Sequence, residues 1–432
     1  MRNSKASNIL AKASEAHRLG KKKQAERLYR KLVSARPEMG SAWNGLGTLL
    51  FETGRLKQAE YALKQAIEAS RPYPRALYNL ALIYHRRGFG QKAFRCLERL
   101  LATEPGFAQA WNFMGVILKD QGKLQTAFEY TEKALELLPS YAEAWNNKGV
   151  LLDAVGKRDE AVAAYKKALS IQPNYLSALF NLAQALHNSG DLLGASSYYR
   201  KVLALEPGHT QAAFLLKAAS CDQNEVPEAA PIQYVEGLFD QCSDKFEDVL
   251  VKELGYKTPW HLLSLASPYI GKEIAILDLG CGTGLAAPLL RPLASYLAGI
   301  DASQKMLAHA EKKDLYEELV QADILKEWRL KQNSFDFIFC ADVLVYVGAL
   351  ETVFCKVRDH LRSHGIFAFS VEEGSAAKYE LRNSGRYAHS RHYIESCLDK
   401  EGLALLETKQ SVLRRDQNEP VEGILFVARK RE

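Results

Sequence analysis

The stretch that decides the fold of the C-terminal half reads I-A-I-L-D-L-G-C-G-T-G and spans residues 274–284. Its first four residues are apolar and partly β-branched, which is typical of a buried strand. Gly280, Gly282 and Gly284 follow at every second position, and an apolar segment of helical character comes after them. Glycines let the backbone turn sharply and approach a ligand closely, because they carry no Cβ. A strand, a glycine turn and a helix form the first half of a nucleotide-binding βαβ unit.

The spacing of these glycines distinguishes the turn from a dinucleotide-binding fingerprint. That fingerprint runs G-x-G-x-x-G, whereas the present G-x-G-x-G is one residue shorter and is preceded by Asp278. The carboxylate of Asp278 would repel a pyrophosphate and attract a ligand that carries an ammonium or sulfonium group. The run resembles motif I of the class I S-adenosylmethionine-dependent methyltransferases. The alternative is an ordinary glycine-rich turn in an α/β domain, and the spacing disfavours an NAD-dependent oxidoreductase.

The resemblance implies S-adenosyl-L-methionine as the cofactor and assigns residues to its parts. The loop residues that would surround the methionine part are Asp278, Gly280, Cys281, Gly282 and Gly284. The string G-I-D-A-S-Q-K-M-L resembles the second motif of the family, and its Asp301 lies 21 residues after the first glycine. A carboxylate at this position can accept hydrogen bonds from both ribose hydroxyls. The alternative role for Asp301 is a helix N-cap, which Ser303 would supply equally well.

Three further residues follow later strands of the expected sheet. In this fold Ala322 would offer its backbone N–H to adenine, and Asp323 would accept a hydrogen bond from the adenine amino group. Asp323 is otherwise a solvated turn residue. Asp342 follows the fourth strand and would face the methionine end of the cofactor or the substrate.

The C-terminal half is expected to contain seven strands, the last two forming an antiparallel hairpin. They are 274–277, 296–300, one within 319–325, 335–340, 366–371, 404–412 and 423–428. This pattern matches the Rossmann-like α/β sheet of class I methyltransferases over residues 232–432. Residues 232–270 have helical spacing and resemble a lid, in which Phe239 and Phe246 either cover the cofactor or belong to the core.

The N-terminal half repeats itself every 34 residues. Glycine recurs at 20, 54, 88, 122, 156 and 190, and alanine at 25, 59, 93, 127, 161 and 195. The period and the residue types resemble the tetratricopeptide repeat, an all-α pair of helices that stacks into a superhelix. Six repeats are expected at 6–39, 40–73, 74–107, 108–141, 142–175 and 176–209, with a capping helix starting at 210.

Two features of the repeats call for a reason. Asparagine is a poor helix former, yet it recurs at two adjacent phases of the first helices, at 79, 147 and 181 and, one position earlier, at 44, 112 and 146. These side chains bind the backbone of a bound peptide, bond between repeats, or simply face water. Lys148 replaces the usual apolar residue of the fifth repeat, and the sequence gives no explanation.

Composition indicates a two-part protein of the cytoplasm. Residues 1–219 carry 32 Lys/Arg and 18 Asp/Glu, a net charge of +14, whereas residues 220–432 carry 25 and 33, a net charge of −8. The seven cysteines lack a C-x-x-C pair, which favours reduced thiols over disulfides or a metal site. No apolar run is long enough to span a membrane, and the N-terminus lacks the apolar core of an export signal. The expected organisation is a repeat array at 6–219, a linker at 220–231 and a catalytic domain at 232–432.

Methyl transfer is an in-line displacement, and it needs a base only if the nucleophile starts protonated. The candidates near the expected site are Asp342, Tyr346, Tyr387, His389 and His392. His389 is preferred as the base, because it follows the fifth strand on the substrate side, and its alternative role is a structural hydrogen bond. No D/N-P-P-Y motif is present, and the catalytic half is acidic, so we expect no nucleic-acid substrate.

The sequence therefore predicts an S-adenosylmethionine-dependent methyltransferase whose repeat array recruits a protein partner or substrate. A protein or extended peptide would bind the concave face of the array, and the acceptor would be a small molecule or a protein. The strings G-R-Y-A-H-S (385–390) and V-L-R-R-D-Q-N-E-P-V-E-G-I-L-F-V-A-R (412–429) resemble the bacterial methyltransferases that carry such repeats. The alternative is a protein-interaction scaffold with a vestigial or regulatory cofactor-binding domain.

Overall fold

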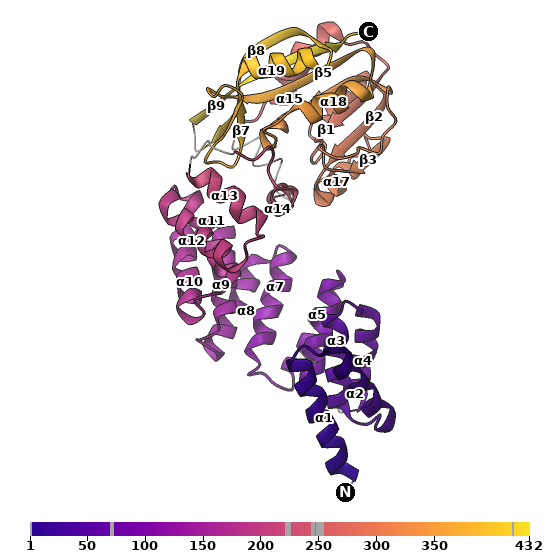
Figure 1. Ribbon diagram of the computed structural model, residues 1–432, viewed down its shortest axis with the longest axis vertical. Helices are drawn as coiled ribbons and strands as arrows, with labels where there is room; N and C mark the ends of the chain where they lie inside the picture. Colours follow the sequence, from indigo (N-terminus) through magenta and orange to yellow (C-terminus); the bar gives the residue numbers. More distant parts are fainter. Residues whose placement is uncertain (1, 70–72, 221–225, 243–246, 248–254, 417–418) are drawn as a thin grey trace. The chain divides into compact units, whose positions relative to one another are not determined.

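The computed structural model describes residues 2–69, 73–220, 226–242, 247, 255–416 and 419–432. The chain forms two compact units, Met1–Ser189 and Gly190–Glu432. The first contains helices only, and the second joins two further helices to a mixed α/β fold (Figure 1).

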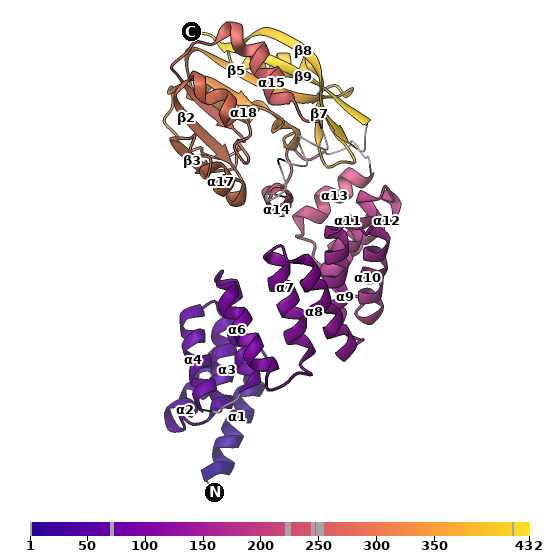
Figure 2. The same cartoon turned by 180° about the vertical axis from the view of Figure 1, so that it is seen from behind.

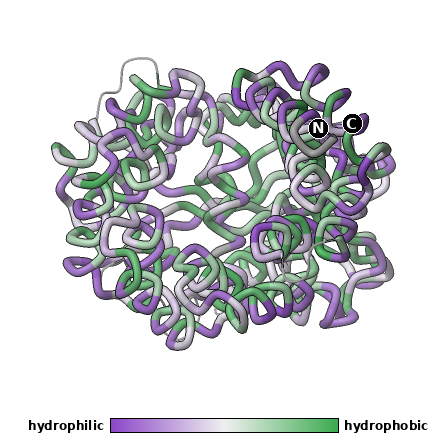
Figure 3. The backbone as a smooth tube through the Cα atoms, turned by 90° about the horizontal axis from the view of Figure 1, so that it is seen from below, coloured by the Kyte–Doolittle hydropathy of each residue, from purple (hydrophilic) through white to green (hydrophobic). Residues whose placement is uncertain are grey.

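The helices of the first unit come in pairs that repeat with the period seen in the sequence. Their bounds are α1 (Arg2–Arg18), α2 (Lys22–Ala35), α3 (Gly40–Glu52), α4 (Leu56–Ala69), α5 (Pro74–Arg86), α6 (Gly90–Leu101), α7 (Ala108–Asp120), α8 (Leu124–Leu137), α9 (Ala142–Ala154), α10 (Arg158–Ile171) and α11 (Leu176–Asn188). The second unit begins with α12 (Leu192–Leu205) and the expected capping helix α13 (Thr210–Ser220). Hydrophobic and hydrophilic stretches alternate along the helical turns, as each helix buries one face (Figure 3).

The recurrent glycine and alanine have separate structural causes. Each turn glycine adopts a left-handed conformation, for example φ 75° at Gly54 and 74° at Gly122, which other residues adopt only with strain. The recurrent alanines, such as Ala59 and Ala127, are fully buried where the two helices of a pair approach each other. A larger side chain there would separate the helices.

The asparagines bond between repeats. The amide of Asn79 donates to the Asn44 carbonyl oxygen (3.1 Å), and the same bond joins residues 147 to 112 (3.0 Å) and 181 to 146 (2.9 Å). At the one intervening junction the same two positions hold Tyr78 and Phe113, whose rings pack edge to face at 5.9 Å. In each of these four pairs the second residue lies 35 positions after the first. Asparagine therefore faces asparagine at three junctions, and an aromatic ring faces an aromatic ring at the fourth.

Lys148 is accommodated by its neighbours. Its Nζ lies 2.8 Å from Glu132 Oε1 and 5.0 Å from the centre of the Trp145 ring. The lysine stem therefore fills the apolar position while its ammonium group gains an ion pair and a cation–π contact.

Among its described residues, the second unit is built on a single sheet of nine strands (Figure 2). The strands are β1 (Ile274–Leu279), β2 (Ala294–Asp301), β3 (Glu318–Gln321), β4 (Phe335–Cys340), β5 (Leu361–Glu373), β6 (Tyr379–Leu381), β7 (Tyr387–His389), β8 (Leu403–Asp416) and β9 (Glu419–Lys430). The main order is β3-β2-β1-β4-β5-β9-β8, in which the first five are parallel and β9 runs antiparallel to β5 and β8. These are the seven expected strands. The short hairpin β6–β7 was not expected, and it pairs with the end of β5.

Helices cover both faces of this sheet. Alternate strand residues point to opposite sides, so Ile338 packs with α18 (Glu351–His360) and α19 (Arg391–Lys400), while Phe337 and Phe339 pack with α15 (Thr258–Ala266) and α16 (Ala287–Leu290). The remaining helices are α14 (Ile232–Cys242), α17 (Gln304–Glu311) and the short 3₁₀ turns Ser267–Tyr269, Arg291–Leu293 and Leu344–Tyr346. The helix after the glycine turn is thus much shorter than its apolar sequence suggested. Among the described residues, no helix is both long and apolar enough to cross a bilayer.

The expected linker is only partly a free connection. Glu228 accepts hydrogen bonds from the Gly348 and Ala349 amides (2.8 and 2.9 Å), and Ala230 N–H donates to the Tyr346 carbonyl (2.9 Å). These backbone bonds make residues 228–230 a part of the α/β fold. Residues 221–225 lie outside the described residues.

Helix α13 also belongs to this unit. The ring of Phe214 packs on Tyr234 of α14 at 5.2 Å and on Tyr387 of β7 at 6.3 Å. The Tyr387 hydroxyl in turn donates to the carbonyl of Pro227 (2.8 Å). We therefore propose that the α/β unit begins before residue 232, because the end of the repeat array contributes to its packing.

Candidate functional site

A cavity of about 300 Å³ opens at the carboxyl ends of β1, β2 and β4. Ligands of open α/β sheets bind at this edge, and the volume suits a small molecule. The expected cofactor residues that line it are Asp278, Gly280, Cys281, Gly282, Asp301, Asp323 and Asp342. Gly284, Ala322 and His389 are not among the described residues that line it.

The glycine loop is held open by its own backbone. Gly280, Gly282 and Gly284 all have positive φ, at 76°, 54° and 78°. The amides of Gly280 and Cys281 both donate to the Ile300 carbonyl of β2 (2.8 and 2.9 Å). A Cβ on Gly280 would collide with the side chain of Val343. Glycine is therefore required at this position by both conformation and space.

Asp301 connects this loop to the cavity. Its two carboxylate oxygens accept from the backbone amides of Gly282 (2.9 Å) and Ser303 (2.8 Å). The cap of α17 is Ser303, whose Oγ accepts from Met306 N (3.1 Å), so the alternative N-cap role does not fall to Asp301. Burial raises the pKa of the Asp301 carboxyl to about 6, although the N–H groups of Ser303 and Gly282 oppose the rise.

Asp278 lies behind the loop and is bound by a tyrosine that the sequence did not single out. Its Oδ2 accepts from the Tyr316 hydroxyl at 2.7 Å. Burial raises the pKa of Asp278 to about 7, and the Tyr316 hydrogen bond opposes the rise. The Tyr316 ring passes 3.1 Å from where a Cβ of Gly284 would stand. Gly284 thus makes room for this ring, which explains its absence from the cavity wall.

The expectation for Ala322 is corrected by the structure. Its amide donates to the Asp301 carbonyl (3.0 Å), where it continues the parallel pairing of β2 with β3. That N–H is already satisfied and has no capacity for adenine. The next residue, Asp323, lines the cavity, and its Oδ1 accepts from Leu325 N (2.9 Å).

Asp342 is held by a buried ion-pair network that sequence reasoning missed. Its Oδ1 lies 2.7 Å from Arg414 Nη1, and the other nitrogen of that guanidinium pairs with Glu372. Arg414 and Glu372 are 3% and 2% exposed. Asp342 itself has a positive φ of 60°, and its amide donates to Ser370 Oγ (2.8 Å). The pairing of β5 and β8 with β9 brings these distant residues together, and no local pattern signals it.

His389 does not have the position of a catalytic base. It lies on β7 and is fully buried. Its Nε2–H donates to the carbonyls of Val347 (2.9 Å) and Gly348 (3.1 Å), while Nδ1 has no partner among the described residues. Burial lowers the pKa of His389 to about 4. The expected role as base is therefore wrong, and the histidine ties β7 to the turn after β4.

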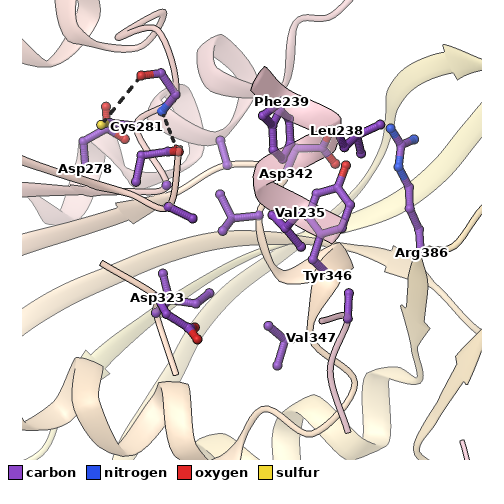
Figure 4. Close-up of a pocket in the computed structure, with 18 of the residues that line it drawn as sticks. Val235, Leu238, Phe239, Asp278, Cys281, Asp323, Asp342, Tyr346, Val347 and Arg386 are labelled. Carbon is purple, nitrogen blue, oxygen red and sulfur yellow. Dashed lines mark hydrogen bonds between the residues drawn. The ribbon is translucent and has the colours of Figure 1, made fainter. Parts of the chain in front are cut away.

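Away from the glycine loop the cavity wall is largely apolar, and its basic side chains among the described residues are Arg386 and Arg414. Val235, Leu238 and Phe239 of α14 line the cavity, and Phe239 meets the Tyr346 ring edge to face at 5.5 Å. Figure 4 shows Arg386 beyond Tyr346, at the side away from Asp278 and Cys281. Phe239 thus lines the cavity, and its role as a cover of the cofactor stays a prediction, whereas Phe246 lies outside the described residues.

A second contact of the lid segment was also missed. Glu247 Oε1 accepts from Thr283 Oγ1 and from Lys313 Nζ, both at 2.6 Å. The threonine of the glycine loop thereby joins the segment that follows α14. Among the described residues, no cluster of His, Cys, Asp and Glu could hold a metal ion.

Family profiles match both parts of the chain. A profile of the methyltransferase domain matches residues 277–369. Five profiles of the tetratricopeptide repeat match residues 10–74, 50–117, 108–141, 142–175 and 164–195.

Individual relatives are similar over part of their length. A ubiquinone biosynthesis O-methyltransferase of Glaesserella parasuis serovar 5 is 28% identical over 138 residues, which are 28% of this chain and 58% of that protein. A malonyl-[acyl-carrier protein] O-methyltransferase of Hamiltonella defensa is 26% identical over 171 residues, which are 39% and 63% of the two chains. The structure of an S-adenosylmethionine-dependent methyltransferase from Mesorhizobium loti aligns with a TM-score of 0.34 at 25% identity, covering 40% of this chain and 98% of that one. The chain spans between 32% and 63% of the curated relatives it matches.

The residues around the cavity fit the cofactor of such a domain, S-adenosyl-L-methionine. The glycine loop gives space and backbone approach, and Asp301 presents a carboxylate at the end of β2. Asp278 adds a buried acid next to the loop, where a positively charged amino acid moiety is favoured. The chain therefore carries an S-adenosylmethionine-dependent methyltransferase domain behind an N-terminal series of tetratricopeptide repeats.

Proposed function

We propose that the α/β unit transfers a methyl group from S-adenosyl-L-methionine to an acceptor, and that the repeats recruit a protein partner or substrate. The observation that carries the first part is Asp301, whose carboxylate lines the cavity beside the glycine loop. A carboxylate here suits two vicinal hydroxyls, such as those of a ribose.

The lining residues suggest how the chain would hold the cofactor. Asp301 would accept from the ribose hydroxyls, and Asp323 from the adenine amino group. Gly280 and Gly282 would lie against the methionine part, whose ammonium group Asp278 attracts. When bound, S-adenosyl-L-methionine supplies an electrophilic methyl group on a sulfonium.

The other residues of the cavity would align the acceptor and exclude water. Leu238 and Phe239 of α14 form an apolar wall, which disfavours water beside the reacting atoms. Asp342 is fixed by Arg414, so this edge of the cavity keeps its shape without cofactor. Alignment and exclusion of water are the main requirements of an in-line displacement.

Calorimetric titration of the full chain tests this proposal. We expect binding of S-adenosyl-L-methionine and no binding of NAD. Asp301→Ala should weaken binding by about 2 kcal/mol, roughly 30-fold, because charge-assisted hydrogen bonds are lost. Asp399→Ala is the control, since that side chain is 72% exposed and pairs only at the surface with Arg431. Binding of NAD would indicate a dehydrogenase, and binding of neither ligand would favour the non-catalytic scaffold.

The proposed recruiting role rests on the repeats and their charge. Stacked repeats of this kind offer extended surfaces, and the N-terminal half carries a net charge of +14. Several relatives are, by their names, methyltransferases of malonyl-[acyl-carrier protein], in which the acceptor is carried by a protein. An acidic or extended protein segment is therefore the proposed partner, in the cytoplasm.

Cross-linking mass spectrometry of the full chain in its own lysate tests the recruiting role. We expect cross-links from acidic segments of a partner to lysines of residues 1–189, and we expect fewer of them as salt rises. Cross-links confined to residues 190–432 would contradict the proposal.

A further inference from the structure

One arginine of the cavity wall lacks the partner that its neighbours have. Arg414 and Arg382 both pair with Glu372, in addition to other contacts. Arg386 lines the cavity, and within the described part of the chain it forms no ion pair with a carboxylate. Its guanidinium lies near the hydroxyl oxygen of Tyr346, which favours the charged form.

This arginine keeps its charge in apolar surroundings. Val235, Leu238 and Val347 line the same cavity. Burial works against the charged form, but the charges of Asp342 and Glu372 and the oxygen of Tyr346 outweigh it and raise the pKa of Arg386. The guanidinium therefore stays charged without an ion-pair partner of its own, and a carboxylate ligand would supply that partner.

Among the described residues, the same end of the cavity offers no unpaired carboxylate and no histidine or lysine that could remove a proton. Its described lining residues include neither histidine nor lysine. Asp342 is held by the Arg414 guanidinium, and the fully buried His389 does not reach the cavity. An acceptor hydroxyl or ammonium group has to lose a proton during methylation, whereas a carboxylate does not.

We propose that Arg386 binds the carboxylate of the methyl acceptor, and that this carboxylate is the group that becomes methylated. The inference rests on the proposed methyltransferase function. A lone pair of the carboxylate oxygen forms the bond to the methyl carbon, while the bond from that carbon to sulfur breaks and its electron pair stays on sulfur. The positive charge of the sulfonium and the negative charge of the carboxylate both disappear. The products are a methyl ester and a thioether, and no proton is transferred.

The geometry of a guanidinium suits this role. Its planar fork can hold a carboxylate by two parallel hydrogen bonds, which fixes the plane of the acceptor. Figure 4 places Arg386 at the side of the cavity away from the glycine loop, with Asp342 and Tyr346 between them. The apolar lining from α14 suits the carbon chain of an acyl carboxylate.

The proposed role of Arg386 explains the residues around it in the string G-R-Y-A-H-S (385–390). Gly385 has φ 73°, and a Cβ there would stand 2.7 Å from the Tyr234 hydroxyl, so the hairpin passes close under α14. Arg386 follows and lines the cavity. Tyr387 and His389 anchor β7 by hydrogen bonds to the backbone of neighbouring segments. The hairpin β6–β7 is therefore a rigid support for one binding residue.

The test measures carboxylate binding on the full chain saturated with S-adenosylhomocysteine. Hexanoate and the neutral hexanamide are titrated by ligand-detected NMR. We expect wild type to prefer hexanoate by at least about tenfold, and Arg386→Leu to lose this preference. Arg391→Leu is the control, because that side chain is 58% exposed and pairs with Glu395 on its own helix. Equal affinity of wild type for the two ligands would overturn the proposal.

Two further readouts separate this inference from the function on which it rests. Arg386→Leu should keep the affinity for S-adenosylhomocysteine within about twofold of wild type. A tenfold loss would assign Arg386 to the cofactor's own carboxylate and overturn the inference while the proposed function stands. Failure of wild type to bind S-adenosylhomocysteine would overturn both. With methyl-tritiated cofactor and hexanoate, the label should be released as methanol by alkali, and no label or alkali-stable label in the product would contradict a carboxylate acceptor.

Discussion

Replacing Arg414 by methionine should destabilise the α/β unit strongly. The guanidinium is 3% exposed and joins Asp342 to Glu372, so its removal leaves two carboxylates without their shared cation. Loss of one partner from a buried ion pair costs about 3–5 kcal/mol. Glu372 keeps Arg382 at 3.0 Å, and Asp342 borders the cavity, where water can reach it. We therefore expect the lower end, about 3 kcal/mol.

The assay has to report on this unit alone, because the repeats can unfold separately. Hydrogen exchange of peptides from β4 and β5, followed against urea by mass spectrometry, gives the opening free energy of the sheet. Arg382→Met is the matched control: it pairs with the same Glu372, but its side chain is 35% exposed, so we expect about 1 kcal/mol or less.

The combination of Arg414→Met with Glu372→Gln and Asp342→Asn should recover part of the loss, because the uncompensated charges are gone. A cost for Arg414→Met below about 1 kcal/mol, or equal to that of the control, would refute the network as a source of stability.

Three other expectations concern the site and its supports. Burial raises the pKa of Asp278 to about 7, and a ligand ammonium group favours the carboxylate, so cofactor binding should release part of a proton at pH 7 and tighten as pH rises. Calorimetry in buffers of different ionisation enthalpy measures this, and a buffer-independent enthalpy would contradict it. Gly280→Ala should weaken binding of S-adenosylhomocysteine more than tenfold (about 1.4 kcal/mol), because its Cβ meets Val343, whereas Gly402→Ala, at a similar φ of 67° in open space, should not. Burial lowers the pKa of His389 to about 4, below the usual ~6.5, so stability should fall as pH drops between these values, and His389→Gln should flatten that fall in acid unfolding curves. If the acid unfolding curves of wild type and His389→Gln ran parallel, a group other than His389 would cause the loss of stability.

Much of the fold could be predicted because its signals are local and repeated. Helices α3, α5 and α7 begin at residues 40, 74 and 108, where the sequence period placed the repeats, and β4 has the bounds read from its apolar run. The seven main strands and their terminal antiparallel hairpin followed from the apolar runs, one glycine motif and the family resemblance. A further signal in the sequence was not used. Positions 35 residues apart carry matching residue types: asparagine pairs with asparagine at three junctions, and Tyr78 pairs with Phe113 at the fourth.

The rest depends on long-range pairing that leaves no local pattern. The strands β6 and β7 have three residues each, so their side-chain alternation is too short to recognise. Arg414 appeared only as part of an R-R-D run, and the sheet brings it to Asp342, 72 residues earlier. His389 was assigned by its place after β5, yet the hairpin turns it into the core. Tyr316 bonds Asp278 from 38 residues away, without a motif of its own.

The most direct test of the central claim is the position of bound S-adenosylhomocysteine in a crystal structure of the full chain. We expect both ribose hydroxyls within hydrogen-bonding distance of the Asp301 carboxylate, about 2.5–2.9 Å, with the adenine beside Asp323 and the sulfur facing Asp342. Ligand density outside this cavity, or a ribose that makes no contact with Asp301, would contradict the account.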